Sequence, residues 1–539
     1  FQTSVTGSNN TAVTWSVSGA GCSGLSCGSI SSGGLYTAPA TVPSPATVNV
    51  KATSKANSSS SASAVVTVGA TNNSKLTGPY AFFFTGFDAN GVYQAAGSVI
   101  ADGKGNLTSG KEDVNDTTGP SSAIPVKGTY QVGADSRGVM TITSSLGTRT
   151  YRFALNLLGT KGRFISFDQS GIRGSGVIER QDPTAFDPSV FVGGYVFNLT
   201  GMDVYGARIG ALGLIFPDGN SFISGSSLDV NDGGAVPPTF ATFDGSYTVD
   251  PTGRGTMTLS IPGFDGGTFD FAFYVVSANE FLMVSADPLS YNNPIFSGPA
   301  EAQTGAPFAS SSFVGPSVFS LSGTNGVNPE DTVGRFLFDG SSNVTVNDDQ
   351  NSGGQITVAG LWTGAYGVGL NGRGTLNLYN PSNGNITIWY IYAIAPNQAF
   401  VMDASTSAVG IGEMDPQIAV LPFSNSNILG TYLFGSGEPI VQTTPLYSGI
   451  ADFDGGNSIS GQGSLTGAED ISQSSTLLSN QVLAGTYSIS LASNNGRGDL
   501  LLTLPSGKTI AVWVASSSEF VGLDLDPSTV QPTILHFEQ

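Results

Sequence analysis

The sequence predicts an all-β protein: a small N-terminal β-sandwich followed by four tandem antiparallel repeats of about eight strands each. Three observations carry this prediction. The 539 residues include 73 glycines, 32 phenylalanines and 17 tyrosines, and only 11% are charged, a composition that favours strands and turns over helices. Apolar and polar residues alternate over short stretches that end in turn residues. One pattern recurs four times at nearly constant spacing, which indicates internal repeats.

The first segment, residues 1–70, reads as short strands about ten residues apart. Thr11–Gly19 and Ala46–Ser54 alternate apolar and polar residues, and Trp15 lies within the first of them. This pattern is typical of a small β-sandwich. Cys22 and Cys27 are the only cysteines, and the loop between them can be closed by a disulfide. Since two cysteines and a single distant histidine are too few ligands for zinc, the pair predicts a disulfide and an oxidising compartment. Two free thiols are the alternative.

This segment resembles the bacterial immunoglobulin-like (Big-type) domains of cell-surface proteins. The resemblance lies in TWSVSG, the cysteine pair, GSISSGGLYTAPATVPSPATVNVKATS and the closing AVVTV. It implies a spacing or adhesive role outside the cell and no catalytic residues. Such sandwiches usually begin with a strand before the one that corresponds to Phe1–Thr6, and this strand is missing here. We therefore expect a groove with unpaired backbone groups, which a strand of another copy would fill head to tail. The alternative is that the strand is not included in this chain.

Four copies of one domain follow, at residues 76–182, 190–304, 312–416 and 427–539. The opening strand of each copy has a common reference position, occupied by Tyr80, Tyr195, Ser317 and Tyr432. An Asp-Gly pair follows 22 or 23 residues later, at Asp102, Asp218, Asp339 and Asp454. An Arg-Gly pair comes later still, at Arg137, Arg254, Arg373 and Arg497. The joints between copies are short, so neighbouring copies should touch or nearly touch.

The first copy predicts eight strands joined by short turns. We expect them at 79–87, 92–101, 106–115, 125–132, 138–145, 149–157, 162–168 and 174–181. Consecutive antiparallel strands in one sheet tend to close because closure removes the edges. An up-and-down barrel is therefore the leading prediction, and a flattened two-sheet sandwich is the alternative. The copies also resemble uncharacterised repeats of large secreted acidobacterial proteins, which implies secretion and repetition but no activity.

Charge and hydropathy exclude several classes of function. The net charge is −20, the wrong sign for binding a nucleic-acid backbone or an anionic membrane. The longest apolar run, Ile386–Ala395, is too short to cross a membrane and reads as a buried strand. No signal peptide stands at the start, so we expect the numbering to begin inside a mature chain. The last residues, HFEQ, match the repeat endings GVIERQ and GPAEAQ, so we expect a natural C-terminus.

The recurring polar residues have structural and functional interpretations. Asp-Gly favours a type I′ hairpin turn. The repeated Arg either caps turn carbonyls, pairs with the repeated Asp, or grips a ligand. Clustered Asp and Asn side chains suit calcium, but Asx turns explain them equally. These calcium candidates are Asp113, Asn115, Asp116, Asp229, Asn231, Asp232, Asn347, Asp348 and Asp349. The fourth copy keeps only Glu469 and Asp470. We expect no cofactor.

The same residues argue against an enzyme. His536 is the only histidine, so a repeated Ser-His-Asp site is impossible, and the acidic residues that recur lie in predicted turns. We expect an extracellular structural protein of a bacterium: a stalk, an adhesin or a self-associating filament subunit. The alternative is a secreted protein whose barrels bind a small apolar ligand or a glycan. The barrel interiors discriminate the two, because a dry apolar interior indicates a scaffold and a polar cavity indicates binding.

Overall fold

The protein is all-β, as the sequence predicts. The computed structural model describes residues 1–39, 41–237, 239–261, 267–418, 421–456, 462–474, 476–490, 493–505 and 507–539. Apart from strands, its regular elements in these ranges are short 3₁₀ helices. They are η1 (Gly24–Cys27), η2 (Asn73–Lys75), η3 (Pro183–Ala185), η4 (Pro188–Val190), η5 (Ser310–Ser312) and η6 (Asn425–Asn427). The chain divides into two compact units: the first is Phe1–Asn72 with Gln131–Asp135, and the second is Asn73–Tyr130 with Ser136–Gln539.

The first unit contains two small antiparallel sheets. Its strands are β1 (Val13–Ser18), β2 (Ser29–Ile30), β3 (Tyr36–Thr37), β4 (Thr47–Ser54) and β5 (Ser61–Thr67). One sheet has the order β1-β4-β5, and β2 pairs with β3. The predicted disulfide between Cys22 and Cys27 is present, and Cys27 packs with Val48 and Val68 in the core of this unit.

One expectation for this unit is wrong. Phe1–Thr6 forms no strand, and the first strand begins at Val13. The Phe1 ammonium instead donates a hydrogen bond to the Gly34 carbonyl at 2.7 Å, and its ring packs on Trp15 and Tyr36. The aromatic contact on the face of the sheet replaces strand pairing at its edge. Strands β1 and β5 are therefore the edges of the three-stranded sheet.

The second unit consists of four antiparallel barrels in sequence. Barrel 1 comprises β6 (Thr77–Phe87), β7 (Val92–Asp102), β8 (Asn106–Asp116), β9 (Ser121–Pro125), β10 (Lys127–Val132), β11 (Arg137–Ser144), β12 (Gly147–Leu155), β13 (Lys161–Ser166) and β14 (Arg173–Arg180). Strand β14 pairs with β6, and β10 pairs with β8, which closes the sheet. The predicted fourth strand of this copy thus begins earlier and is split in two, β9 and β10.

Barrels 2 to 4 each close with eight strands. Barrel 2 comprises β15 (Tyr195–Met202), β16 (Arg208–Ile215), β17 (Phe222–Asp232), β18 (Phe240–Val249), β19 (Arg254–Ser260), β20 (Thr268–Ser277), β21 (Glu280–Ser285) and β22 (Ile295–Ala302). Barrel 3 comprises β23 (Val314–Asn325), β24 (Asn328–Asp339), β25 (Asn343–Ser352), β26 (Gln355–Val368), β27 (Arg373–Tyr379), β28 (Ile386–Ala395), β29 (Gln398–Asp403) and β30 (Ala408–Pro416). Barrel 4 comprises β31 (Leu429–Ser436), β32 (Leu446–Asp454), β33 (Gly463–Gln473), β34 (Thr476–Ile489), β35 (Arg497–Leu504), β36 (Lys508–Ser516), β37 (Glu519–Asp524) and β38 (Ile534–Glu538).

Large apolar side chains pack in the barrel interiors. In barrel 2 the alternating row Tyr195, Phe197 and Leu199 points inward, and each of these residues is at most 1% exposed. Phe273 and Phe281 pack in the same interior with ring centroids 4.9 Å apart. The remaining cavity there is about 20 Å³, which leaves room for little more than one water molecule. Packing of this kind stabilises each barrel from within.

The Asp-Gly turns differ from the expected type. Only the glycine adopts a positive φ, for example 72° at Gly103, whereas a type I′ turn requires it at both central residues. Strand β7 ends at Asp102 and β8 begins at Asn106, so the turn is longer. The Asp102 carboxylate accepts the backbone N–H groups of Lys104 and Asn106 at 2.7 and 2.9 Å. These hydrogen bonds and that from the Asn106 amide lower the pKa of Asp102 to about 2.

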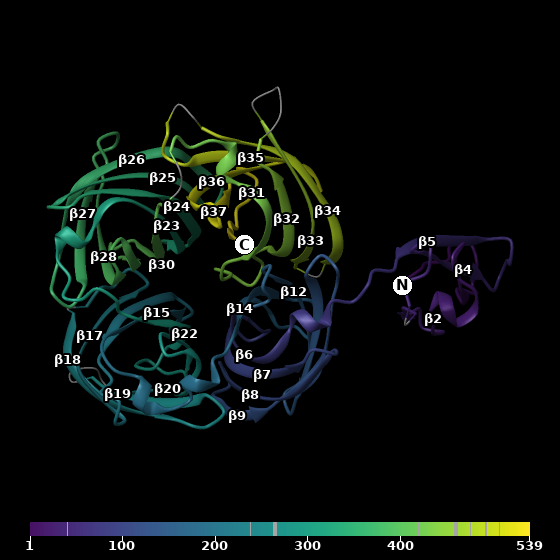
Figure 1. The fold of residues 1–539 in the computed structure, drawn as a ribbon, viewed down its shortest axis with the longest axis horizontal. Coiled ribbons are helices and arrows are strands. Elements are labelled where there is room, and N and C mark those ends of the chain that lie inside the picture. Colours follow the sequence, from purple (N-terminus) through teal and green to yellow (C-terminus); the bar gives the residue numbers. More distant parts are fainter. Residues whose placement is uncertain are drawn as a thin grey trace. The chain divides into compact units, whose positions relative to one another are not determined.

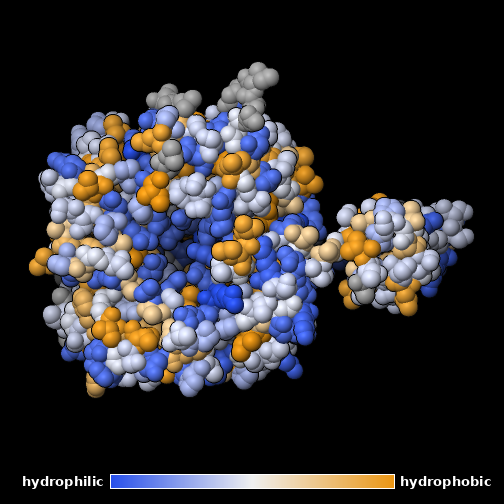
Figure 2. Space-filling view, viewed as in Figure 1, coloured by the Kyte–Doolittle hydropathy of each residue, from blue (hydrophilic) through white to orange (hydrophobic). Residues whose placement is uncertain are grey.

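The four barrels are arranged in a ring (Figure 1). Apolar residues on the outer faces of adjacent barrels pack against one another at every joint. Val196 and Leu212 of barrel 2, for example, pack with Tyr392 and Met402 of barrel 3. This explains why strands β15 and β16 are buried on both faces. Figure 2 shows that hydrophilic residues surround a hollow at the centre of one face of this ring.

Candidate binding site at the centre of four joined barrels

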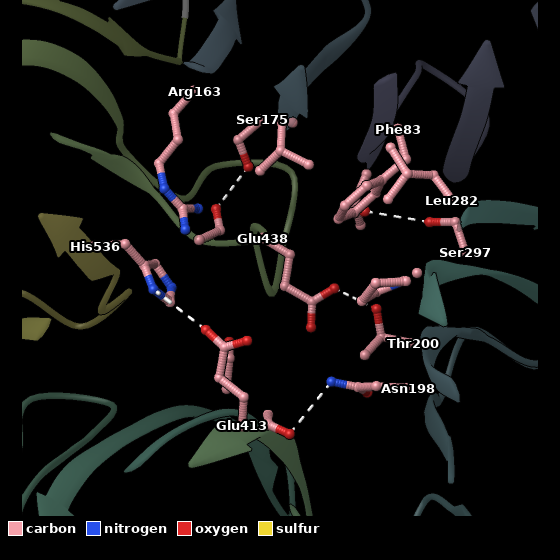
Figure 3. A pocket seen from close by; sticks show the side chains of 18 of the residues that line it. Phe83, Arg163, Ser175, Asn198, Thr200, Leu282, Ser297, Glu413, Glu438 and His536 are labelled. Carbon is pink, nitrogen blue, oxygen red and sulfur yellow. Dashed lines mark hydrogen bonds and ion pairs between the residues drawn. The ribbon is translucent and has the colours of Figure 1, made fainter. Parts of the chain in front are cut away.

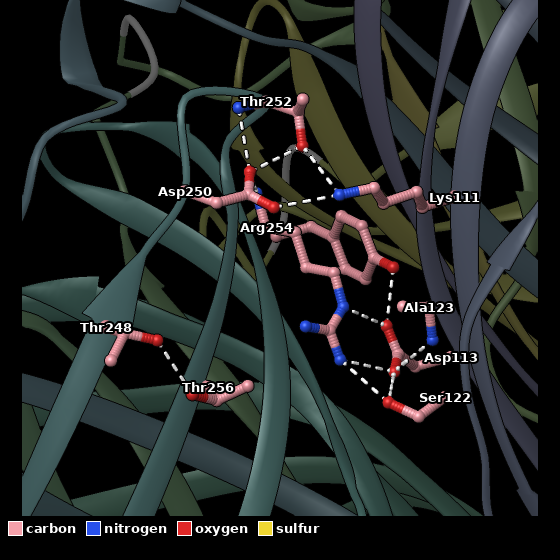
Figure 4. Close-up of polar contacts among 10 residues, drawn as sticks. Lys111, Asp113, Ser122, Ala123, Thr248, Asp250, Thr252, Arg254 and Thr256 are labelled. Carbon is pink, nitrogen blue, oxygen red and sulfur yellow. Dashed lines mark hydrogen bonds and ion pairs between the residues drawn. The ribbon is translucent and has the colours of Figure 1, made fainter.

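A buried ion pair joins barrel 1 to barrel 2. Arg254 on β19 donates two hydrogen bonds to Asp113 on β8, from Nε and Nη2, both at 2.7 Å (Figure 4). The Tyr274 hydroxyl donates to the same carboxylate at 2.6 Å. Burial raises the pKa of Asp113, but the hydrogen bonds from Arg254 and Tyr274 outweigh it, so that the pKa lies below its usual value. Asp113 is therefore ionised and fully paired near neutral pH.

The same contact recurs at the next two joints. Arg373 of barrel 3 binds Asp229 of barrel 2 with Nε at 2.5 Å and Nη2 at 3.0 Å. Arg497 of barrel 4 binds Asp349 of barrel 3, with Nε 2.8 Å from Oδ2. An aromatic donor completes each pair: the Tyr392 hydroxyl at 2.7 Å from Asp229 and the Trp513 indole N–H at 2.8 Å from Asp349. The repeated Arg thus pairs with an Asp of the preceding barrel and not with the Asp of Asp-Gly.

The asparagine two residues after each Asp binds the following barrel as well. Its amide nitrogen donates to two backbone carbonyls near the last two strands of that barrel. The donor and its two acceptors are Asn115 to Ser285 and Asp287, Asn231 to Asp403 and Ala408, and Asn351 to Asp524 and Thr529. Asp-x-Asn and Arg-Gly therefore form one repeated joint.

This geometry corrects the alignment of the calcium candidates in the third copy. The counterparts of Asp113 and Asn115 are Asp349 and Asn351, four residues later than the Val-Asn-Asp match in the sequence suggests. Asn347 donates to the Gly360 carbonyl at 3.3 Å, and the Trp362 indole donates to Asp348 at 3.1 Å.

The remaining candidates are turn residues. Asp116 accepts the Thr118 N–H at 2.7 Å, and the Asp232 backbone N–H donates to Ala235 at 2.9 Å. Within the residues that the structure describes, no three acidic, histidine or cysteine side chains are grouped so that they could ligate a metal ion.

The joint that closes the ring, between barrels 4 and 1, has a different chemistry. Arg137 Nη1 is 3.5 Å from Asp470, longer than at the other joints. Ser472 occupies the position of the asparagine, and Ala154 that of the aromatic donor. New contacts replace them: Arg163 donates to Glu538 at 2.6 and 2.8 Å, and Lys161 lies 3.2 Å from the same carboxylate. Arg173 donates to three backbone carbonyls of barrel 4.

The reference positions of the opening strands lie at one end of each barrel. Their hydroxyl groups donate to a carbonyl of the turn before the next-to-last strand of that barrel. The pairs are Tyr80 to Gly159, Tyr195 to Ala278, Ser317 to Asn397 and Tyr432 to Ser517. Four equivalent residues thus make four equivalent hydrogen bonds. These hydrogen bonds hold the first strand of each barrel against that turn.

Two adjoining cavities of about 180 and 270 Å³ lie where the four barrels meet. Every barrel lines them, and Figure 3 shows the side chains of the first cavity converging from all sides. Four carboxylates occupy equivalent positions in the last strands of the barrels. In each barrel, an inward-facing phenylalanine of the first strand pairs with a residue of the last strand, and the carboxylate belongs to the next residue. They are Glu179, Glu301, Asp415 and Glu538. The cavity therefore has an approximate fourfold arrangement of acidic side chains.

The charges in these cavities are unbalanced. Eight carboxylates line them: Glu179, Glu280, Glu301, Glu413, Asp415, Glu438, Glu519 and Glu538. The cations among the lining residues are Lys161 and Arg163, and both contact Glu538. Burial raises the pKa of Glu538, but the two cations outweigh it, and its pKa is lowered. Burial and neighbouring carboxylates raise the pKa of Glu301 and Glu519 to about 7, so the cavity takes up protons at mildly acidic pH.

A segment of barrel 4 enters one of the central cavities. Strands β31 and β32 are separated by residues 437–445, the longest of the four first-hairpin connections. Its Glu438 accepts hydrogen bonds from Thr200 and Arg208 of barrel 2. Ser175 of barrel 1 donates to the Gly437 carbonyl at 2.6 Å. The segment therefore binds barrels 1 and 2 to barrel 4 across the centre.

The sequence interpretation missed the central residues. The acidic residues near the repeat ends in GVIERQ, GPAEAQ and HFEQ were a usable signal, but Lys161, Arg163, Arg173 and Glu438 do not recur between copies. Their roles depend on ring closure, which local patterns do not encode.

No protein-family model matches the chain, and no curated protein is significantly similar to it. In the part of the chain that the structure describes, no helix has the length and apolar character needed to cross a membrane.

Proposed function

We propose that this chain is an extracellular structural protein of a bacterium, a stalk, adhesin or self-associating filament subunit, in which the four barrels form one rigid block. The proposal rests on one observation: the recurring charged residues connect the barrels. Asp113, Asp229 and Asp349 and their arginine partners all bind one barrel to the next. Recurring polar residues that join modules favour a scaffold over a repeated catalytic site.

The interiors of barrels 2 and 3 support the same proposal. Each contains a continuous apolar core, and the 20 Å³ cavity of barrel 2 is too small for an organic ligand. The disulfide fits an oxidising, extracellular compartment. The low content of charged residues, 11%, fits a secreted surface rich in Ser, Thr, Asn and Gly.

Self-association by β-strand addition would use the edge strands β1 and β5 of the first unit. Val68 donates its backbone N–H to the carbonyl of Ala46, the residue before β4. Because N–H groups alternate in direction along a strand, those of Ser63 and Val65 point to the free edge of β5. The same alternation directs the N–H groups of Val13 and Val17 to the free edge of β1, since the Lys55 N–H donates to Ala12. Free edges of this kind accept a strand from another chain.

The test is the assembly state of the full chain, measured by analytical ultracentrifugation and electron microscopy. We expect concentration-dependent, head-to-tail association of the wild type. Val65→Pro removes an outward N–H at an exposed side chain, and Val13→Pro does so on β1. At least one of the two should return the protein to monomers with little loss of thermal stability. A wild type that stays monomeric at all concentrations, or association unchanged in both variants, contradicts strand addition.

The structural role itself has a separate test. The scaffold proposal expects one stiff particle containing four barrels, visible in single-particle images whether or not chains associate. Native material imaged on the bacterial surface should contain this particle as a repeating or terminal unit. Particles with four independently oriented barrels would contradict the rigid block.

A further inference from the structure

Barrel 4 has a large cavity at one end. Its volume is about 470 Å³, within the range of small-molecule sites. Apolar side chains form much of its wall, among them Ile471, Leu502, Ile510 and Leu535. Val530, at 54% exposure, also lines it and reaches solvent.

A difference between the repeats lies in the wall of this cavity, at Ile510. Position 510 lies three residues before Trp513, which pairs with Arg497. The residues at the same distance before the partners of Arg137, Arg254 and Arg373 are Tyr151, Phe271 and Trp389. Barrels 1 to 3 thus place a buried aromatic ring where barrel 4 has isoleucine.

The polar groups of the cavity carry an unmatched negative charge. Lys508 donates to Asp524 at 2.7 Å and to the Tyr447 hydroxyl at 3.2 Å. Glu469 is only 4% exposed and lines the cavity, and no described residue makes a hydrogen bond or ion pair with its carboxylate. Its counterpart in barrel 1, Glu112, is paired with Arg149 at 3.2 and 3.3 Å.

An unpaired buried carboxylate is costly unless a partner of opposite charge reaches it. Burial raises the pKa of Glu469 to about 7, and the nearby Lys508 and Arg137 offset this only in part, as expected of a carboxylate without a directly bonded cation. Asp524 is already bound by Lys508, so the missing component is one positive charge. The surrounding wall is apolar, so the molecule that supplies the charge would also need an apolar body.

We propose that the open end of barrel 4 binds a small organic cation, a primary ammonium group attached to an apolar chain or ring. The ammonium pairs with Glu469, and the apolar part packs against Ile510, Leu502 and Leu535. This activity goes beyond the structural role of the ring. The loop that borders the site is fixed by Asn351 of barrel 3, which donates to the Asp524 and Thr529 carbonyls. The site therefore belongs to the assembled ring.

The experiment is calorimetric titration of the full chain at pH 8 with n-octylammonium, n-octanol and n-octanoate. At this pH Glu469 is ionised, and the three probes share one apolar chain. We expect one octylammonium per chain, with octanol and octanoate at least tenfold weaker. Equal affinities for octanol and octylammonium would overturn the proposal, because the charge would then contribute nothing.

Three variants locate the site. Glu469→Gln keeps the shape and should weaken octylammonium binding at least tenfold. Ile510→Phe restores the aromatic ring of the other barrels and should abolish binding by filling the cavity. Asp452→Asn removes an exposed carboxylate from the same barrel and should change affinity less than twofold. Binding that persists within twofold of wild type in Glu469→Gln or Ile510→Phe overturns the proposal. Comparing the three probes on the wild type tests it even if a variant fails to fold.

Discussion

The three joints between consecutive barrels and the joint that closes the ring all hold two barrels together, but the closing joint does so with different residues. At each consecutive joint a buried Asp receives an arginine and an aromatic donor, and an asparagine binds two carbonyls. The apolar contact at these joints is broad, as between Val318 and Val333 of barrel 3 and Trp513 of barrel 4. The closing joint has a cluster of only Ala154, Leu433 and Ile450, and relies on Lys161, Arg163 and Arg173.

The difference follows from chain connectivity. Consecutive barrels are held near each other by short linkers, so one repeated joint suffices and recurs with the repeat. Barrels 4 and 1 are separated by the whole ring, and bringing them together costs the closure entropy of a long loop. Charged hydrogen bonds to Glu538 and to the carbonyls of barrel 4 offset part of this cost. The repeated sequence therefore encodes the joints between consecutive barrels but not the joint that closes the ring.

The largest expected effect is at a consecutive joint. Asp229→Ala should lower the free energy of unfolding by about 3–5 kcal/mol, because Arg373 and Tyr392 would remain buried without their acceptor. Asp470→Ala, the matched change at the closing joint, should cost only about 1 kcal/mol since its contact with Arg137 is long. Urea unfolding of both variants measures the difference. Equal losses would show that the two kinds of joint are energetically the same.

The second effect is pH dependence, which should arise at the centre of the ring and not at the consecutive joints. The pKa of Asp113 is lowered, so it stays ionised from pH 5 to 8. The pKa of Glu301 is raised to about 7, so the folded state binds more protons than the unfolded state between pH 4.5 and 7. Stability should therefore fall as pH rises from 5 to 8, by about 3 kcal/mol for one such group.

Thermal unfolding across this pH range, with Glu301→Gln beside wild type, measures the effect. The variant cannot ionise at this position, so its stability should change less with pH. A wild type that becomes more stable between pH 5 and 8, or a variant with the same pH dependence, contradicts the assignment.

The smallest effect concerns the asparagine of the joint. Asn115→Ser places at the first joint a serine, the residue type that the closing joint has at the equivalent position, Ser472. It removes two hydrogen bonds to the carbonyls of Ser285 and Asp287, so we expect a loss of about 1–2 kcal/mol. The matched variant Ser472→Asn should gain no stability, since Arg173 already donates to the Ser472 carbonyl. A gain equal to the loss in Asn115→Ser would mean that the two joints share one geometry.

Much of the fold could be predicted because its determinants are local. Alternating apolar residues and Gly turns place the strands of barrel 1 within a few residues of their observed bounds. Asp102 and Gly103 mark a turn correctly, although its type is wrong, because the Asp side chain accepts two N–H groups that a two-residue turn does not offer.

In the sequence, the residues of the joints stand out only because they recur in each copy, without a reason for the recurrence. Asp113 and Arg254 recur, but sequence spacing alone does not reveal that they meet across two barrels, and the calcium interpretation used the same residues. The third copy was misaligned by four residues because Asn347 and Asp348 resemble the motif. Glu438 and Arg163 have no counterparts in other copies, so no pattern could mark them.

The most direct test of the closed ring is the energetic coupling between Arg163 and Glu538. These residues belong to the first and last barrels and are 375 positions apart. A double-mutant cycle with Arg163→Ala, Glu538→Ala and the double variant, measured by urea unfolding of the full chain, isolates their interaction. The closed ring predicts a coupling of about 1.5 kcal/mol or more, as for buried charge pairs. A coupling of zero would contradict it, because barrels 1 and 4 would then not be in contact.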